Sequence, residues 1–582
     1  MSGEHVLLRA EGQNLAHFVF DSEDLSTVRG GGLMLLGIAD ALQGAIFQRG
    51  GVRELLAGRN TFRLISGGAS IALFDVELKP GTGDRFRDAV EAAISRHATL
   101  KYATVAVDVL PLAKAKNFIE AREGVILANR RRQLRAPSVV VPTDEISLDK
   151  NRDEVPAASA KPVCFIDKVS RAVVAQPMKD GEAKPIGAAT RVRRAEGTNA
   201  KRHQFYKDHT RLSDVPPFYA WDLQQVAGDA PRAVRQLDRK IAVLYIDGNK
   251  FSHKQDDAVR AAPPARQYAA QREFDATLRR LREGVLRDLV AIMMADRPAH
   301  WGPQDAEDPR PEMGLWFNWT RRHFDREDWE YGQPIGRSPR RGRVGWGAVS
   351  RFETLLWGGD ELMWVMPAWK GWEVLTHFYR RDWQVPLTDG NDMTLTHAAG
   401  LVFCHHNAPI RRIKDLAKSL AQLCKDQNDR EDKRRPRDRF AYQVLESFDL
   451  VSGDIERHRH EFLPHLDPAA LLLDPAGLNK VTEAVRELKK QGLPTRQLHQ
   501  LGDKAHLGKA VKLEVKGNEA EVKLAQDNLD FLDRYFGGGS AAGVQMLDLW
   551  DYIAPEAEPV PGREPLRLTL AAEAPAPVES TA

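Results

Sequence analysis

The chain has few cysteines and no long apolar run. Its 582 residues include three cysteines, Cys164, Cys404 and Cys424, and no two of them form a CxxC pair. This scarcity excludes a disulfide framework and a cysteine-rich zinc module. The most apolar early stretch, GLMLLGIADALQGAIF, is interrupted by Asp40 and falls short of the roughly 20 apolar residues that a membrane span requires. Because the first residues also lack a signal-peptide pattern, we expect a cytoplasmic protein without a membrane partner.

Charge of neither sign dominates. The chain contains 84 Lys and Arg residues against 81 Asp and Glu residues, which gives a formal net charge of +3. This balance excludes nucleic-acid binding through bulk positive charge and leaves only local basic patches for that purpose. Hydrophobic residues make up 42% of the chain, enough for a packed core. The length suggests about three to five domains.

Composition and periodicity divide the chain into five segments. Residues 1–135 and 236–430 mix apolar strands with helical patterns, which indicates two α/β units. Residues 136–235 are rich in Pro, Ala, Lys and Arg, and we interpret them as a connector with modest structure. The helical period dominates 431–553, which predicts a helical domain, and the Pro- and Ala-rich tail 554–582 is expected to be disordered.

The two α/β units resemble distant copies of each other. Each contains an apolar strand that reaches Gly-Gly, turns and returns as a second apolar strand, in TFRLISGGASIALFDVE and RFETLLWGGDELMWVMPAW. A helix and a further strand follow in both. We expect the first strands in AHFVFDSEDL, which places Asp21 near a strand end, and in IAVLYIDGNKF. This order predicts an α+β protein with two ferredoxin-like (βαββαβ) domains in tandem, followed by helices.

Three carboxylates are expected to meet in the second copy. Asp247 ends the apolar strand IAVLYIDG, and Asp360 and Glu361 follow the tight turn at Gly358 and Gly359. The two strands are neighbours in the predicted sheet, so their ends would bring the acids together. Clustered carboxylates repel each other and are stable together mainly when a cation neutralises them. Each motif alone favours an ordinary turn with solvated acids, whereas the pair in these two positions favours a metal-nucleotide site.

Magnesium or manganese suits these ligands, because both are hard ions that bind carboxylates together with substrate phosphates. Two such ions would activate a 3′-hydroxyl group and stabilise a leaving pyrophosphate. The carbonyl oxygen of Gly248 would add a further ligand. The later stretch NAPIRRIKDLAKSLAQLCK predicts a helix with Lys414, Lys418 and Lys425 on one side. One of them would reach a triphosphate, although a solvated cationic face is the alternative for any single lysine. In the first copy the turn reads Gly67, Gly68, without following acids.

These motifs resemble a known family. IAVLYIDGNKF, LLWGGDELMWV and THAAGLVFCHHNAPI are similar to the catalytic palm of the large subunit of type III CRISPR effector complexes, which carries a degenerate palm and a palm with a GGDD-type motif in tandem. The resemblance implies a metal-dependent nucleotidyltransferase of antiviral defence that converts ATP into cyclic oligoadenylates, with crRNA, target RNA and other effector subunits as partners. It implies catalytic and metal-binding roles for Asp247, Asp360 and Glu361, a metal-binding role for the Gly248 carbonyl, and nucleotide contacts for Gly248, Asn249, Gly358, Gly359 and Lys425.

The sequence departs from the family pattern in four places. Glu361 stands where the family commonly has Asp, and Asn249 replaces a frequent second acid. No His-Asp dipeptide occurs, and Cys164 alone stands where the cysteine pairs of a zinc ribbon are expected. The resemblance therefore implies a variant without the HD nuclease domain and the zinc ribbon. A GTP-using cyclic-dinucleotide synthase and a non-catalytic RNA-binding scaffold subunit are the alternative functions.

An insertion rich in tryptophan and arginine separates the two motifs of the second copy. We interpret Trp316, Trp319 and Trp329 as a packed cluster in preference to base-stacking residues. Four arginines precede the acidic turn and would either clamp phosphates or belong to a mobile loop: Arg337, Arg340, Arg341 and Arg343.

Overall fold

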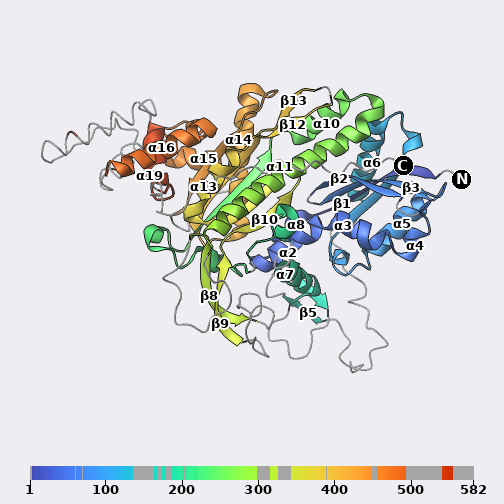
Figure 1. The fold of residues 1–582 in the computed structure, drawn as a ribbon, viewed down its shortest axis with the longest axis horizontal. Helices are drawn as coiled ribbons and strands as arrows, with labels where there is room; N and C mark the ends of the chain where they lie inside the picture. The colour runs from blue at the N-terminus through green and yellow to red at the C-terminus, as the bar shows by residue number, and fades with distance from the viewer. Residues whose placement is uncertain are drawn as a thin grey trace.

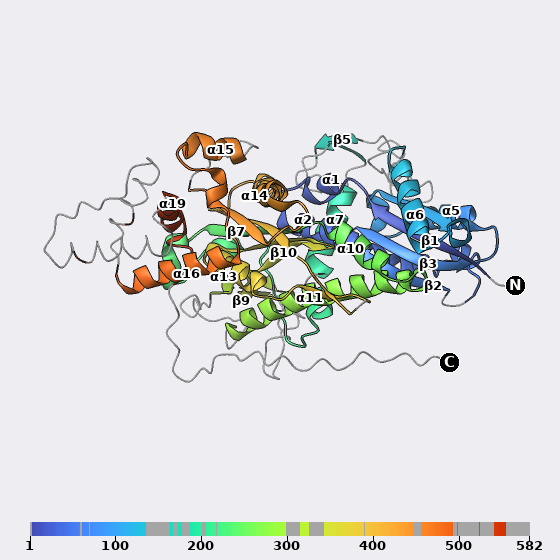
Figure 2. The ribbon, with the colours of Figure 1, turned by 90° about the horizontal axis from the view of Figure 1, so that it is seen from above.

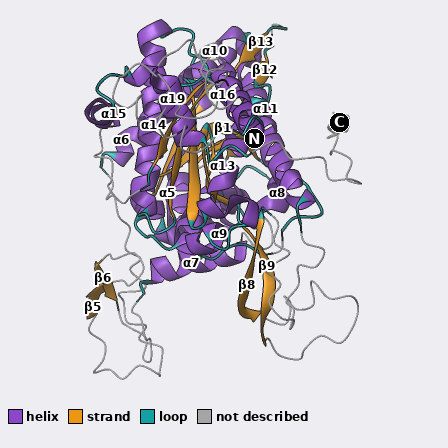
Figure 3. Ribbon diagram, turned by 90° about the vertical axis from the view of Figure 1, so that its left-hand side faces the viewer, coloured by secondary structure: helices purple, strands orange, loops and turns teal. Residues whose placement is uncertain are grey.

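A computed structural model describes most of both α/β units and part of the remainder. The described ranges are 3–135, 163–166, 173–176, 186–200, 205–297, 315–324, 343–446, 455–492 and 540–554. Positions 59, 60, 69, 217 and 389 within these ranges are not described, whereas the isolated residues 498 and 523 are. The predicted tail from 555 onward, Trp329, Arg337, Arg340 and Arg341 lie outside these ranges. Within them the chain is a mixed α/β protein with several sheets, in which the strands lie between layers of helices (Figures 1 and 3).

The first sheet has four strands in the order β2-β3-β1-β4, and each neighbouring pair is antiparallel. The strands are β1 (Glu4–Gly12), β2 (Phe62–Gly68), β3 (Ile71–Leu78) and β4 (Val105–Pro111). Helices α2 (Leu25–Leu36), α5 (Gly83–Ile94) and α6 (Phe118–Gln133) cover it. Val6 and Leu8 of β1 join the core beneath α2 and α5, while Leu7 packs with Phe118 and Val125 of α6. Helices therefore bury both faces of this sheet.

The predicted first strand of this unit is wrong in position. Of the segment expected to be a strand, Leu15–Phe20 forms helix α1, and the strand is the preceding Glu4–Gly12. Asp21 therefore caps a helix, and its carboxylate binds Arg193 through two contacts of 2.7 and 2.9 Å. Short apolar runs do not distinguish helix from strand by periodicity, and pairing with β3 and β4 decides this one.

The second sheet has five strands in the order β10-β11-β7-β14-β15. They are β7 (Lys240–Gly248), β10 (Glu353–Gly358), β11 (Glu361–Pro367), β14 (His397–His405) and β15 (Arg439–Val444). Helices α10 (Phe251–Ala261), α11 (Gln267–Ala295), α13 (Ala368–Tyr379) and α14 (Ile410–Asp432) accompany it. Ala242, Leu244 and Ile246 face the core beneath α11 and α13, whereas Ile241, Val243 and Tyr245 face α14. The first four strands repeat the order and the antiparallel pairing of the first sheet.

Strand β15 corrects the expectation of helix throughout 431–553. It pairs in parallel with β14, and its residues Phe440, Ala441 and Tyr442 are all buried. A strand that is buried on both faces lacks the alternation of apolar and polar residues by which strands are predicted, so its sequence does not distinguish it from a buried helix. Helices α15 (Ile455–Phe462), α16 (Pro475–Lys490) and α19 (Ser540–Leu549) follow, in agreement with the predicted helical character.

The predicted connector contains packed helices. From residue 186 onward it forms α7 (Ala188–Ala200), α8 (Tyr206–Thr210) and α9 (Leu223–Ala227). Helix α7 crosses α2 so closely that a Cβ atom at Gly30 would lie 1.7 Å from the Arg193 carbonyl oxygen. Glycine is therefore required at this crossing. From residue 186 onward the connector thus packs against the first unit and carries more structure than expected.

The remaining strands form small two-stranded sheets. These are β5 (Val163–Ile166) with β6 (Val173–Gln176), β8 (Phe317–Phe324) with β9 (Arg343–Ser350), and β12 (Gln384–Pro386) with β13 (Asp392–Thr394). Trp316 and Trp319 are 2% and 4% exposed, which confirms for these two residues that the tryptophans are packed. No single described helix has the length and apolarity to cross a membrane, although the bent pair Leu25–Leu36 and Ile38–Ile46 passes that test by length and composition alone.

A buried ion pair joins the two sheets. Arg29 of α2 binds both carboxylate oxygens of Glu353 at the start of β10, and its remaining donors reach the carbonyl oxygens of Gly197 and Ala220. Both charged side chains are at most 4% exposed. Burial lowers the pKa of Arg29 to about 10, with partial compensation from Tyr206 and Tyr219. The two sheets are packed side by side around this contact (Figure 2).

We predict that Arg29→Met destabilises the protein by about 3–5 kcal/mol, because it leaves the Glu353 carboxylate buried without its main partner. The double variant Arg29→Met, Glu353→Met should be more stable than Arg29→Met alone. Urea-induced unfolding at neutral pH measures both effects. Arg87→Met is the control, since Arg87 binds the exposed Asp84 and Asp88 on the surface and such pairs contribute about 1 kcal/mol or less. Equal losses for Arg29→Met and Arg87→Met would contradict the prediction.

Candidate active site

The structure places the three predicted acids at one end of the second sheet. Asp247 and Glu361 are direct partners in the pairing of β7 with β11. Asp360 lies at the turn between β10 and β11, and its backbone oxygen accepts a hydrogen bond of 3.1 Å from the Gly248 N–H. Tyr245 connects the acids, because its hydroxyl group lies 2.6 Å from Glu361 Oε1 and 3.4 Å from Asp247 Oδ2. Residues far apart in the chain therefore meet through strand pairing, as predicted.

Two glycines allow this geometry. Gly359 has a φ angle of 55°, in the left-handed region that side chains other than that of glycine rarely adopt. A Cβ atom at Gly248 would lie 2.4 Å from the Phe251 ring, so a side chain there would displace the start of α10. The predicted glycines are thus needed by the backbone itself, whatever ligand the turns contact.

The site has an excess of negative charge. The pKa of Asp360 is raised to about 6, mainly by burial and in addition by the charges of Asp247 and Glu361, while Lys425 lowers it. Burial and the same two carboxylates also raise the pKa of Tyr245, so its hydroxyl group remains protonated and donates. These shifts have the sign expected for carboxylates that lack a sufficient counter-charge.

Helix α14 supplies two cations that contact the acids. Lys425 Nζ lies 2.7 Å from Asp247 Oδ1, and Lys418 Nζ lies 3.6 Å from Glu361 Oε1. Lys414, one turn before Lys418, lies instead over the Phe20 ring of the first unit, 4.1 Å from its centre. Two of the three predicted lysines therefore face the acids, and the Lys425 side chain is about three-quarters buried.

Asn249 makes contacts within the protein. Its side-chain amide donates to Thr396 Oγ1 at 3.1 Å and to the Arg437 carbonyl oxygen at 3.0 Å, and its backbone N–H binds the Thr396 carbonyl oxygen. The residue is 2% exposed. It anchors the loops before β14 and β15, and its predicted contact with a nucleotide stays a prediction.

The fit of a divalent ion rests on the donor chemistry of the site. Among the described residues, no group of three His, Cys, Asp or Glu side chains is already arranged around a common metal position. Asp247, Asp360 and Glu361 nevertheless offer the hard oxygen donors that Mg²⁺ and Mn²⁺ bind, and the raised pKa of Asp360 shows that an added positive charge would stabilise its ionised form. The residues present therefore fit such an ion, with Lys425 now neutralising Asp247.

The first unit contains a matching position that the sequence analysis missed. Gly12 N–H binds the Ser70 carbonyl oxygen at 2.7 Å, and Gln13 N–H binds the Thr104 carbonyl oxygen at 2.7 Å. These bonds repeat those from Gly248 to Asp360 and from Asn249 to Thr396. The residue before Gly12, Glu11, accordingly occupies the position of Asp247. Glu11 would have been recognised if the first strand had been placed at Glu4–Gly12.

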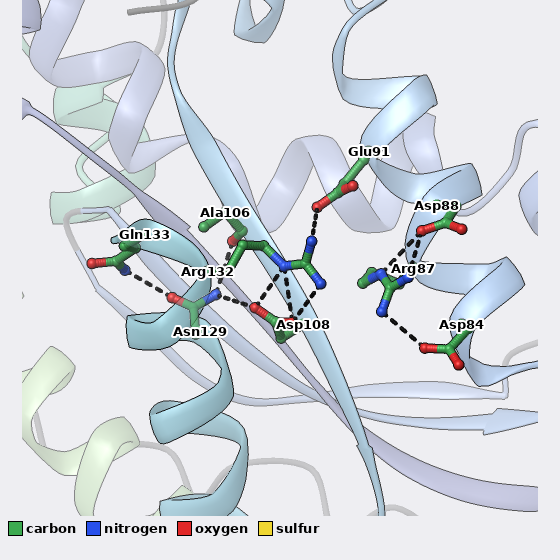
Figure 4. Close-up of polar contacts among 9 residues, drawn as sticks. All are labelled: Asp84, Arg87, Asp88, Glu91, Ala106, Asp108, Asn129, Arg132 and Gln133. Atoms are coloured by element: carbon green, nitrogen blue, oxygen red, sulfur yellow. Dashed lines mark hydrogen bonds and ion pairs between the residues drawn. The ribbon is translucent and has the colours of Figure 1, made fainter. Parts of the chain in front are cut away.

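The acid of the first unit is neutralised by arginines. Glu11 lies 2.9 Å from Arg9 Nη2 and 3.3 Å from Arg130 Nη1, and it is 7% exposed. Arg132, on the next face of α6, binds Asp108 of β4 and contacts Glu91 of α5 (Figure 4). Arg130 and Arg132, both in the last turn of α6, therefore form ion pairs within the first unit. Permanent guanidinium charges take the place that a metal ion would need in this unit.

The described chain is thus a mixed α/β protein in which two similar sheets meet, and one of them carries a carboxylate cluster at its strand ends. No family model matches it, and no curated protein matches it. Solved structures do. A Csm1–Csm4 cassette in complex with one ATP aligns with a TM-score of 0.47 at 11% identity, over 94% of this chain and 70% of that chain.

Csm1 from T. onnurineus aligns with a TM-score of 0.44 at 12% identity, over 95% of this chain and 70% of that chain. A Csm1–Csm4 cassette in complex with cA4 aligns with a TM-score of 0.41 at 12% identity, with the same two coverages. These neighbours are Csm1 subunits of type III CRISPR complexes, the family that the sequence motifs resemble. At this identity the role of a side chain does not transfer from one protein to the other.

We predict that Asp360→Asn stabilises the protein at pH 7.5 in buffer without divalent ions. Between pH 3.8 and about 6 the folded chain retains a proton that the unfolded chain has released, so stability falls as the pH rises through this window. The loss reaches at most about 3 kcal/mol above it. Thermal unfolding at pH 4 and pH 7.5 should therefore show a gain for the variant only at pH 7.5.

Magnesium should stabilise the wild-type protein in the same experiment and have a smaller effect on Asp360→Asn. Asp415→Asn, on the exposed side of α14, is the matched control and should change neither result. A gain for Asp360→Asn of the same size at both pH values would contradict the assignment of the raised pKa to Asp360.

Proposed function

We propose that this chain is a palm-type nucleotidyltransferase that converts ATP into cyclic oligoadenylate messengers, as part of CRISPR-type antiviral defence. The two sheets would be tandem ferredoxin-like palm domains, of which the second is catalytic and the first is degenerate. The observation that carries the proposal is the meeting of Asp247, Asp360 and Glu361 at paired strand ends, where an added positive charge would be stabilising. The first unit lacks such a site because Glu11 is already bound by Arg9 and Arg130.

Two independent lines support this function. The sequence motifs around the acids resemble the family's catalytic palm, and the site geometry places the same residues together. The Csm1–Csm4 cassettes with similar folds were solved in complex with ATP, cA3 and cA4. We propose that effector subunits and guide or target RNA are partners of this chain as well.

The residues suggest a division of labour. Asp247, Asp360, Glu361 and the Gly248 carbonyl oxygen would hold two Mg²⁺ or Mn²⁺ ions, which when bound would supply the Lewis acid for activating a 3′-hydroxyl group and neutralising pyrophosphate. The Tyr245 hydroxyl group fixes the orientation of Glu361 through its 2.6 Å hydrogen bond. Lys425 Nζ lies 2.7 Å from Asp247 Oδ1 beside the site, where its ammonium group would bind a phosphate. The triphosphate would lie next to these groups at the glycine turn, where a Cβ atom at Gly359 would meet no other atom within 4 Å.

The first test is the release of pyrophosphate from ATP. With Mg²⁺ or Mn²⁺, the purified protein together with its co-purified nucleic acid should release pyrophosphate and form products of oligoadenylate mass. Asp360→Asn should reduce the rate by at least about 100-fold, because it removes one charged ligand from the site. Asp415→Asn should leave the rate unchanged. Equal rates for wild type and Asp360→Asn would remove the proposal, and turnover of GTP in preference to ATP would favour the cyclic-dinucleotide synthase instead.

A second test concerns Lys425. Lys425→Met should lower kcat/KM for ATP by about 10- to 100-fold, since a charged contact to a phosphate is lost, and Lys425→Arg should restore part of it. Lys480→Met, on the exposed face of α16, is the control for the loss of a lysine. Steady-state kinetics with varied ATP measures the effect. If Lys425→Met behaves like Lys480→Met, Lys425 contacts Asp247 without serving the nucleotide.

A further inference from the structure

Helix α11 contacts the glycine turns of both sheets. This 29-residue helix runs from the second sheet to the first in both views (Figures 1 and 2). Near its first third, Asp275 accepts a hydrogen bond of 3.0 Å from Ser66 Oγ and one of 3.5 Å from the Gly67 N–H. Two turns further on, Arg282 donates a hydrogen bond of 2.6 Å to the Gly359 carbonyl oxygen. The two contacts are seven residues apart, so they lie on one face of the helix and about 10 Å apart along its axis.

The two turns held by α11 also touch each other. A Cβ atom at Gly68 would lie 3.6 Å from the Gly359 backbone nitrogen, which is ordinary van der Waals contact. Gly359 belongs to the turn that carries Asp360. The first unit thus reaches the candidate active site through its own Gly67–Gly68 turn.

The side chains of Asp275 and Arg282 are largely shielded from water. Burial lowers the pKa of Arg282 to about 10, and the neighbouring charges that oppose this shift are those of Asp275, Glu283 and Asp360. The Arg282 guanidinium also lies over the Trp357 ring, 5.6 Å from its centre. Burial raises the pKa of Asp275, with Arg279 and Ser66 opposing the shift. Removing either side chain would leave partly buried polar groups of the turns without these partners.

The far half of α11 is fixed independently. Asp288 binds Arg381, at the end of α13, at 3.0 Å, and the Arg381 guanidinium packs against Gly284, where a Cβ atom would lie 2.0 Å from it. The buried residues Val285, Leu286, Leu289 and Val290 fix this half of the helix in the core of the second unit, so the partly exposed Asp288–Arg381 pair is not needed to hold it. The other half, which contains Asp275 and Arg282, contacts both glycine turns and so fixes the distance between them.

We propose that Asp275 and Arg282 are positioning residues, which hold the Gly67–Gly68 turn of the first unit at a fixed spacing from the Gly358–Gly359 turn of the catalytic unit. This role rests on the proposed function. The acids and Lys425, which would bind the ions and a triphosphate, all belong to the second unit and do not touch Asp275. A second nucleotide, which must be oriented for joining to the first, would depend in addition on the Gly67–Gly68 turn of the first unit beside the site. Losing the spacing should therefore slow the joining of nucleotides more than it weakens the binding of the first one.

The kinetic experiment compares Asp275→Ala, Arg282→Met and Arg282→Lys with Asp288→Asn, in the full chain with its co-purified partners. We expect kcat for pyrophosphate release to fall by about 10- to 100-fold in Asp275→Ala and Arg282→Met, while KM for ATP changes by less than about 3-fold. Arg282→Lys keeps a donor for the Gly359 carbonyl and should restore most of the rate. Asp288→Asn removes an ion pair from the same helix, away from both turns, and should leave kcat unchanged.

A structural measurement separates this proposal from the proposed function. Hydrogen exchange, followed by mass spectrometry without nucleotide, should show faster exchange of the peptides spanning β2–β3 and β10–β11 in Asp275→Ala and Arg282→Met, and unchanged exchange there in Asp288→Asn. This measurement needs no activity, so it remains informative if the wild-type chain proves inactive. Exchange at the turns that matches wild type in both variants would overturn the proposal. So would a wild-type chain that is active while Arg282→Met and Asp288→Asn have the same kcat.

Discussion

The pairing of Asp247 with Glu361 across β7 and β11 is the constraint on which the second unit depends. Two carboxylates on adjacent strands, with a third at the turn, are costly unless positive charge is near. The described residues supply part of that charge, through Lys425, the more exposed Lys418 and Arg282 near Asp360. Burial, together with the charges of Asp247 and Glu361, raises the pKa of Asp360. Clusters of this kind are more frequent at functional sites than elsewhere, and the proposed cation would supply the positive charge that they lack.

The two units solve one geometric problem in different ways. In both, a glycine after the first strand donates to the turn of the hairpin, and the next residue donates to the loop before the last strand of the repeat. In the first unit the acid at this place, Glu11, is held by two arginines. In the second, Asp247 faces a single lysine on a helix. The same backbone therefore makes a closed ion-pair cluster in one copy and an open, charge-deficient site in the other.

The sequence predicted those features that local pattern determines. The Gly-Gly hairpins, the helix with its three lysines, the helix Pro475–Lys490 and the meeting of the three acids all follow from periodicity, turn residues and strand order. The first strand was misplaced because Leu15–Phe20 is as apolar as Glu4–Gly12, and only the partners β3 and β4 distinguish them. The position of Glu11 was lost with it. The contacts of Asp275 and Arg282 were not predictable either, since they depend on where a long helix lies over two sheets.

The parallel strand β15 changes what counts as the end of the second unit. It follows α14 and completes the sheet beside β14, with Tyr442 held at its hydroxyl group by Asp548 of α19, more than a hundred positions later. A recombinant fragment stopped at the apparent boundary near residue 430 would expose the whole backbone edge of β14 to solvent and to neighbouring molecules. Such a fragment would invite self-association, and a truncation meant to isolate this half of the molecule should therefore retain both Arg439–Val444 and the helix that steadies them.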